Sequence, residues 1–144
     1  MGLKYSQNVS LFLQRVIIGI FTLFVTTVAN ASSLVDHVSM SKEGRQEKIL
    51  ISFNQPVFYL YHTPGKSTNS TLIGLKTVKS TSSSGNSYHQ ALTTAHSEYI
   101  SDMEIFSEAG FNTHMYLQFR TPVNITIKQG SDLRSIIIIL KPGI

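Results

Sequence analysis

Residues 49–57 read Ile-Leu-Ile-Ser-Phe-Asn-Gln-Pro-Val, and residues 115–123 read Met-Tyr-Leu-Gln-Phe-Arg-Thr-Pro-Val. Both stretches place apolar residues at every second position up to a Phe, and both continue with two polar residues and Pro-Val. This period of two predicts a strand with one buried face, because successive side chains of a strand point to opposite sides. Proline lacks the backbone N–H of a ladder, so Pro56 and Pro122 are each expected to end or kink a strand.

The chain around these stretches predicts two similar units of four strands each. In the first unit, at about residues 34–78, strands are expected at 34–40, 48–53, 57–61 and 71–78, with a hairpin turn at 41–45 and a loop at 63–70. Residues 79–98 are rich in Ser and Thr and are expected to form a connecting loop, in which 88–95 allow a short helical turn. The second unit covers about residues 99–141.

The two units match position by position, which favours an internal duplication over a chance likeness of amphipathic strands. A shift of 66 residues matches Asp36 with Asp102, Ser41 with Ser107, Gly44 with Gly110, Phe53 with Phe119, Pro56 with Pro122 and Val57 with Val123. Dropping one residue in the following loop then matches Gly65 with Gly130, Leu75 with Leu140 and Lys76 with Lys141. The last strand, residues 135–140, is apolar on both faces, so it is expected to lie centrally in a sheet. We therefore predict an all-β fold, a β-sandwich of two four-stranded units around one core.

The N-terminal residues 1–31 have the layout of a secretory signal peptide. Lys4 and Arg15 are their only charged residues, residues 16–28 form an apolar run of 13, and Ala29-Asn30-Ala31 supplies small residues for a signal peptidase. The rival interpretation is an uncleaved anchor, but a membrane span needs about 20 apolar residues. We expect cleavage between Ala31 and Ser32 and a periplasmic domain over 32–144. The chain has no Cys, and disulfide-free export is typical of a bacterial envelope.

The charge of the chain argues against nucleic acid as a partner. The formal net charge is +4, from 12 basic and 8 acidic residues. Cleavage would remove two basic residues and no acidic one, leaving 10 against 8, a net charge of +2. These basic residues are dispersed along the chain, whereas nucleic-acid binding requires a concentrated basic patch.

The strand-Phe-x-x-Pro-Val pattern, followed by Asp-Leu-Arg-Ser-Ile-Ile-Ile-Ile-Leu at residues 132–140, resembles the AMIN domain. This module occurs in bacterial envelope proteins such as N-acetylmuramoyl-L-alanine amidases and type IV pilus secretins, and AMIN-like stretches precede tetratricopeptide repeats in some exported proteins. The resemblance covers about residues 34–78 and 99–141. It implies a β-sandwich that acts as a non-catalytic targeting module for peptidoglycan or envelope partners. Arg134 matches the Arg before the family's closing strand, whereas the first unit lacks that Arg.

Seven residues are the binding candidates. Tyr59, Tyr61 and His62 combine apolar rings with polar groups suited to sugar rings or peptide stems. Val57, Tyr59 and Tyr61 are expected to face inward by continuity with Phe53, unless Pro56 resets the register. The candidates for contact with acidic groups of a glycan or stem peptide are the cations Arg120, Arg134 and Lys141, together with Lys128.

No catalytic, metal or cofactor site is expected. The five His residues are scattered, and no pair has the spacing of a zinc site on a helix. No G-x-S-x-G nucleophile turn occurs. Together with the resemblance to the AMIN domain, this implies a binding module for peptidoglycan or an envelope assembly. The alternative is a structural protein that pairs with a partner protein through the edges of its sheet.

Overall fold

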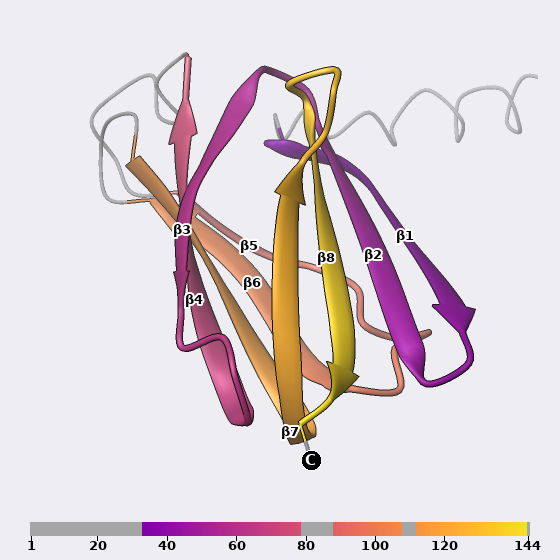
Figure 1. Cartoon of the computed structure of the whole chain (residues 1–144). Coiled ribbons are helices and arrows are strands. Elements are labelled where there is room, and N and C mark those ends of the chain that lie inside the picture. The colour runs from indigo at the N-terminus through magenta and orange to yellow at the C-terminus, as the bar shows by residue number, and fades with distance from the viewer. Residues whose placement is uncertain (1–32, 79–87, 108–111, 144) are drawn as a thin grey trace, which may run out of the picture. The chain divides into compact units, whose positions relative to one another are not determined.

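The computed structural model describes residues 33–78, 88–107 and 112–143, and eight β-strands make up most of them (Figure 1). No helix occurs among these described residues, so the predicted all-β class is confirmed. The predicted signal peptide lies outside the described residues. The strands are β1 (Val35–Glu43), β2 (Gln46–Phe53), β3 (Val57–Thr63), β4 (Thr68–Thr77), β5 (Tyr88–Ala91), β6 (Ile100–Ser107), β7 (Asn112–Gln129) and β8 (Ser135–Pro142).

All eight strands belong to one open antiparallel sheet. Its main path runs β1-β2-β8-β7-β4-β3, and β6 pairs with β7 while carrying β5 on its other side. The isoleucine-rich β8 therefore lies between β2 and β7, as its two apolar faces predicted. The division of this sheet into the two layers of a sandwich remains a prediction.

The long strand β7 joins two parts of the sheet. Its residues 112–119 pair with β4 and β6, whereas residues 123–129 pair with β8. Figure 1 shows the strand bending sharply at the bottom of the view, beside its label. The partners change over at Arg120–Pro122, which are exposed. Pro122 therefore lies where the strand exchanges its partners and does not end it, whereas Pro56 lies in the gap between β2 and β3.

A single core cluster collects every second residue from both parts of the sheet. Both repeated Phe residues are buried, Phe53 at 4% and Phe119 at 5% exposure, as their spacing predicted. The fully enclosed side chains include Ile49 and Ile51 of β2, Ile73 and Leu75 of β4, Met103 and Ile105 of β6, Met115 and Leu117 of β7, and Ile136, Ile138 and Leu140 of β8.

One strand was not foreseen. β5 lies inside the stretch predicted as a Ser/Thr-rich loop, and it is extended where a helical turn was considered. It pairs with β6 over four residues, and Tyr88 packs against the core. The extended conformation is favoured over a helical turn because the residues of β5 pair with β6 in the sheet, whereas a short isolated helix would have no such partner.

Candidate binding site

An irregularity in β3 decides which way its tyrosines point. Tyr59 pairs with Leu75 of β4, but Tyr61 pairs with Gly74, so Leu60 is an extra residue in the ladder. A bulge of this kind shifts the alternation of side chains by one. Val57 is fully buried and Tyr59 is half-buried on the inner face, as expected. Tyr61 is 44% exposed and lies on the outer face, so the expectation that it faces inward is wrong.

Gly74 provides the surface on which the Tyr61 ring lies. A Cβ atom added to Gly74 would lie 2.3 Å from Cε1 of Tyr61, so the ring occupies the space of the missing side chain. An aromatic ring that covers a strand glycine restores packing that the glycine lacks. In this position the Tyr61 hydroxyl lies 3.3 Å from Nε2 of His114 on the neighbouring strand β7.

The contact continues across the sheet as a row of rings. His114 stacks on Phe106 of β6, with 5.7 Å between ring centroids and 28° between planes. His89 of β5 pairs with Phe106 in the ladder, and its Nε2 lies 2.7 Å from Oε2 of Glu104. We call Tyr61, His114, Phe106 and His89 the aromatic row. It crosses five strands from β3 to β5, with Gly74 under the Tyr61 ring.

Tyr59 and His62 form a separate pair on the other side of β3. The Tyr59 hydroxyl lies 2.6 Å from Nδ1 of His62, and burial raises the pKa of Tyr59. The backbone N–H of Tyr59 donates to Oε1 of Gln129 at 2.8 Å, and Gln129 Nε2 donates to the Val57 carbonyl at 2.9 Å. These contacts fasten β3 to the end of β7. Tyr59 and His62 therefore have a structural explanation and do not share the face of Tyr61.

The four predicted cations lie in different parts of the fold, and one of them, Lys128, is exposed in β7 opposite Ile137. Arg120 is exposed in the bend of β7, and its backbone N–H donates to the Tyr99 carbonyl at 2.8 Å. Arg134 is exposed in the turn before β8, where its carbonyl accepts from Phe53 N–H at 2.7 Å. Lys141 is exposed near the end of β8, opposite Asn124. None of them shares a cross-strand row with Tyr61, so the sequence identified only one residue of the aromatic row.

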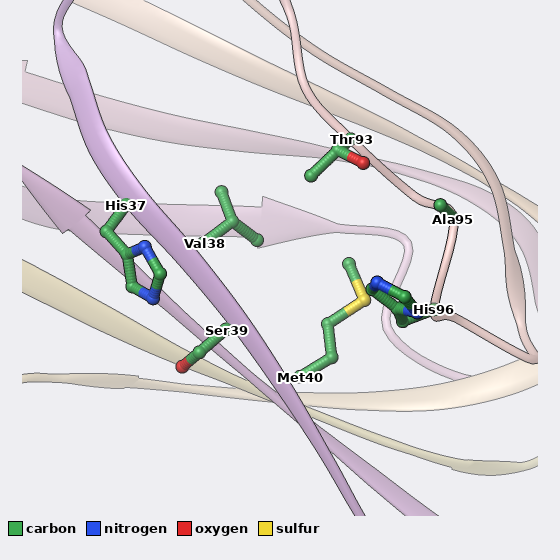
Figure 2. Close-up of a pocket in the computed structure, with 7 residues that line it drawn as sticks. All are labelled: His37, Val38, Ser39, Met40, Thr93, Ala95 and His96. Atoms are coloured by element: carbon green, nitrogen blue, oxygen red, sulfur yellow. The ribbon is translucent and has the colours of Figure 1, made fainter.

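A second surface feature is a pocket of about 200 Å³ along β1 (Figure 2). It is lined by His37, Val38, Ser39, Met40, Thr93, Ala95 and His96. In Figure 2, Val38 and Met40 point toward the segment of Thr93 to His96, while His37 and Ser39 point to the other side of β1.

A buried carboxylate holds the segment that forms the far wall of this pocket. Glu47 of β2 is 2% exposed, and it accepts hydrogen bonds from the Ser97 hydroxyl and from Glu98 N–H, the latter at 2.9 Å. Lys42 of β1 forms an ion pair with Glu98, and the Tyr99 hydroxyl donates to the Arg45 carbonyl at 2.7 Å. The wall is thus fixed to the β1–β2 hairpin at several points.

No known protein family, curated protein or solved structure matches this chain. Within residues 33–78, 88–107 and 112–143, no group of three or more acidic or histidine side chains is placed to hold a metal ion. The same part of the chain contains no helix long and apolar enough to cross a membrane. The site is therefore characterised by its own geometry alone.

Proposed function

We propose that this chain is a non-catalytic binding module of a bacterial cell envelope, which recognises peptidoglycan or an envelope protein assembly through the aromatic row. The proposal includes export to the periplasm behind a signal peptide that is cleaved near Ala31, and a domain similar to the AMIN domain. The finer fold proposed with it is a β-sandwich that arose by internal duplication.

The strand pairing supports the duplication. β1 pairs with β2 as β6 pairs with the first part of β7, and β3 pairs with β4 as the second part of β7 pairs with β8. The registers agree as well: Ile49 lies opposite Ile138, and the matched residues Met115 and Ile73 lie opposite each other. Each half thus receives its closing strand, β8 or β4, from the other half. In β1 the register corrects the sequence matching by one residue: Asp102 corresponds to His37 and not to Asp36, and Phe106, not Ser107, corresponds to Ser41. A shared pairing and register are expected of a duplicated unit, and they support it over a chance likeness of β segments.

The same correspondence indicates that the fold does not require the aromatic row. In the first half, the row that corresponds to Phe106, His114, Gly74 and Tyr61 consists of Ser41, Lys48, Ile139 and Thr126. An equivalent ladder therefore forms without aromatic residues on its outer face. Tyr61 and His89 are exposed and His114 and Phe106 are half-buried. Accessible rings that the sheet can do without favour a binding role, and this observation carries the proposal.

The chemistry of the row suits a glycan with attached peptides. Tyr and Phe rings present flat apolar faces on which the C–H face of a sugar can pack, and the Tyr61 hydroxyl supplies a polar group at the rim. His89 and Glu104 add hydrogen-bonding groups at the β5 end of the row. The row runs across neighbouring strands, which lie about 4.8 Å apart, so it presents a line of groups to an extended polymer.

Sedimentation with purified peptidoglycan sacculi tests this proposal. The full chain should co-sediment at low salt, and Tyr61→Ala should weaken the binding by roughly tenfold, since a stacked aromatic contributes about 1 kcal/mol or more. Leu60→Ala is the matched control, because Leu60 is the adjacent residue and is 51% exposed. Failure of the full chain to sediment at low salt, or equal losses for Tyr61→Ala and Leu60→Ala, would contradict wall binding through this row.

A second candidate function is assembly through sheet edges. β1 pairs only with β2, so one of its edges is open within the part of the chain that the structure describes. Such an edge offers N–H and C=O groups to another polypeptide. This candidate predicts a complex with a protein partner and no affinity for glycan.

A further inference from the structure

The pocket of Figure 2 follows the open edge of β1. Its lining includes four consecutive residues of the strand, 37–40. Side chains of consecutive strand residues alternate between the two faces, so only a pocket that runs along the edge can contact all four. The backbone of β1 therefore borders this pocket.

A second edge of the sheet corresponds to this one and is covered by a strand of the same chain. By pairing and register, β1 corresponds to β6: Val38 lies opposite Ile51 as Met103 lies opposite Leu117. Both strands also have an irregularity at the same place, between Val35 and His37 and between Ile100 and Asp102. The edge of β6 is covered by β5, which adds four antiparallel residues there.

The backbone groups that this pairing uses can be identified. At the β5–β6 junction, Leu92 N–H donates to the Met103 carbonyl at 2.8 Å. Residues two apart along a strand direct their backbone groups to the same side. The counterparts of Met103 and Ile105 in β1 are Val38 and Met40, so the N–H and C=O groups of these two residues point to the open edge.

We propose that the edge of β1 binds an extended peptide segment of a partner protein, which runs antiparallel to β1 as β5 does to β6. Its residues opposite Val38 and Met40 point toward the pocket and are apolar or aromatic, because Val38 and Met40 present apolar side chains there. In β5 the corresponding positions are Leu92, beside Met103, and Gln90, opposite Ile105. The residue between them points outward and is free to be polar. The partner motif is therefore apolar, any residue, apolar, in extended conformation.

The dimensions of the pocket agree with this occupant. Its volume of about 200 Å³ lies below the range of roughly 300–1,000 Å³ that small-molecule sites occupy, and it has room for the side chains of a short strand. The wall of Thr93 to His96 is held by Glu47, so little ordering is required when the peptide enters. Charged residues, Asp36, Lys42 and Glu43, lie toward the two ends of β1, and charges on an edge discourage indiscriminate pairing along it.

This site rests on the second candidate function, assembly through sheet edges, and it names the edge and the kind of partner. It does not depend on binding of glycan by the aromatic row. The test uses a peptide with the sequence of residues 87–93, Ser-Tyr-His-Gln-Ala-Leu-Thr, because it contains Tyr88–Ala91, the strand β5 that covers the corresponding edge. The peptide is added at millimolar concentration to the isotope-labelled full chain, and amide chemical shifts and hydrogen exchange are followed by NMR.

Binding should shift the amide signals of residues 37–40 in a saturable way and slow the exchange of the Val38 and Met40 amides. Val38→Pro removes an edge N–H that the β1–β2 ladder does not use, so this variant should stay folded and lose the shifts. Val38→Thr keeps the N–H and the shape, and it should still bind. A peptide with Pro in place of its Gln should not bind even to the unaltered chain, and this control requires no protein variant.

Three results would overturn the proposal. The first is the absence of saturable shifts at residues 37–40. The second is slow exchange of the Val38 and Met40 amides in the dilute, peptide-free chain, because the chain would then cover its own edge. The third is a dimer that dissociates in Val38→Pro, because a second copy would then be the occupant. Sedimentation with sacculi is unaffected by each of these outcomes, so this failure is distinguishable from that of the glycan proposal.

Discussion

The contact between Tyr61 and Gly74 shows how one missing side chain gives a surface its chemistry. Glycine within a strand usually weakens it, because glycine loses more conformational freedom on folding than other residues and packs no side chain. At Gly74 the Tyr61 ring fills the vacant space and reaches His114. The corresponding residue in the other half is Ile139, so a larger residue is compatible with this strand position where no ring lies over it.

The effect of Gly74→Ala on the free energy of unfolding should therefore depend on whether the Tyr61 ring is present, and should reverse its sign when the ring is removed. With Tyr61 present, the new methyl group must displace the ring and should destabilise the protein by about 1–3 kcal/mol. In a Tyr61→Ala background the same change should be neutral or stabilise by about 0.5–1 kcal/mol, because a strand prefers Ala to Gly when space is free. A double-mutant cycle from urea unfolding measures the coupling. Equal effects of Gly74→Ala in both backgrounds would show that the ring does not lie on Gly74.

A second residue-scale prediction concerns Asp132 in the turn before β8. Its Oδ1 accepts from Arg134 N–H at 2.9 Å and from the Ser135 hydroxyl at 2.8 Å. These two hydrogen bonds, the one from Arg134 first, hold the pKa of Asp132 below its ordinary value of 3.8. A lowered pKa means that the carboxylate stabilises the fold above the ordinary pKa, and that this contribution disappears as the pH falls through the folded-state pKa.

Asp132→Ala should accordingly lower the melting temperature at neutral pH. The difference from the unaltered chain should narrow as the pH falls below about 4, where the carboxylate of the unaltered chain becomes protonated. Thermal unfolding across pH 2–7 by circular dichroism checks this expectation, with Asp36→Ala as a control at another exposed Asp. A difference that stays constant or grows in acid would refute the role of the charged carboxylate.

At the scale of elements, the two faces of β8 are both apolar but differ in burial. Ile136, Ile138 and Leu140 are fully buried toward the core, whereas Ile137 and Ile139 are half-buried on the other face. The sequence predicted a central strand because both faces are apolar, and the pairing with β2 and β7 confirms it. The run of isoleucines alone could not reveal which face meets the core, because both faces are equally apolar.

Ile138→Ala should cost about 2–5 kcal/mol, because it removes fully buried methyl groups and leaves a cavity in the core. Ile139→Ala should cost about 1–2 kcal/mol, because a half-buried side chain loses less apolar contact and leaves no closed cavity. The two residues are neighbours of the same type, so each is the other's control. Urea unfolding of both variants measures the difference, and equal costs would mean that β8 is not oriented as described.

The sequence predicted strands better than it predicted partners. Alternation of apolar residues predicted β2 and the first part of β7, since a buried face requires it. The one-residue slip between the two matched stretches was predicted in the loop that follows, whereas the structure has the irregularity at Leu60 within β3. Alternation could not reveal that β2 pairs with β8, because pairing across such a separation depends on the whole sheet. The sequence did not predict β5, because Tyr88 is the one large apolar side chain in its four residues and no alternation can be recognised there. The sequence also did not predict the partners of Tyr61 in the aromatic row, because a row across five strands can be recognised only once the strand order is known.

At the scale of the whole sheet, the two halves of the sequence are interleaved. The ladders β2–β8 and β4–β7 each join one strand from the first half to one from the second. Without these ladders, β2 and β4 in the first half and β7 and β8 in the second would each have an unpaired edge next to buried residues. An exposed edge beside apolar side chains is unstable as a monomer and prone to association.

This interleaving predicts the behaviour of fragments cut within residues 79–87. Neither residues 33–78 nor residues 88–144 should fold as a monomer, because each fragment lacks the strand that completes its sheet. Mixed together, they should form a one-to-one complex with β-rich circular dichroism and a cooperative unfolding transition. Analytical ultracentrifugation and thermal melts of each fragment and of the mixture measure this.

The first fragment alone has one route to order, which the correspondence between β4 and β8 allows. A second copy can place its β4 beside β2, with Ile73 of one copy opposite Ile49 of the other, as Ile138 lies in the intact chain. Residues 33–78 should therefore be either unfolded or a two-fold dimer that exchanges β4, a form of domain swapping. A folded, monomeric fragment with its own cooperative transition would contradict the interleaved pairing, because β2 would then have found a closing strand within its own half.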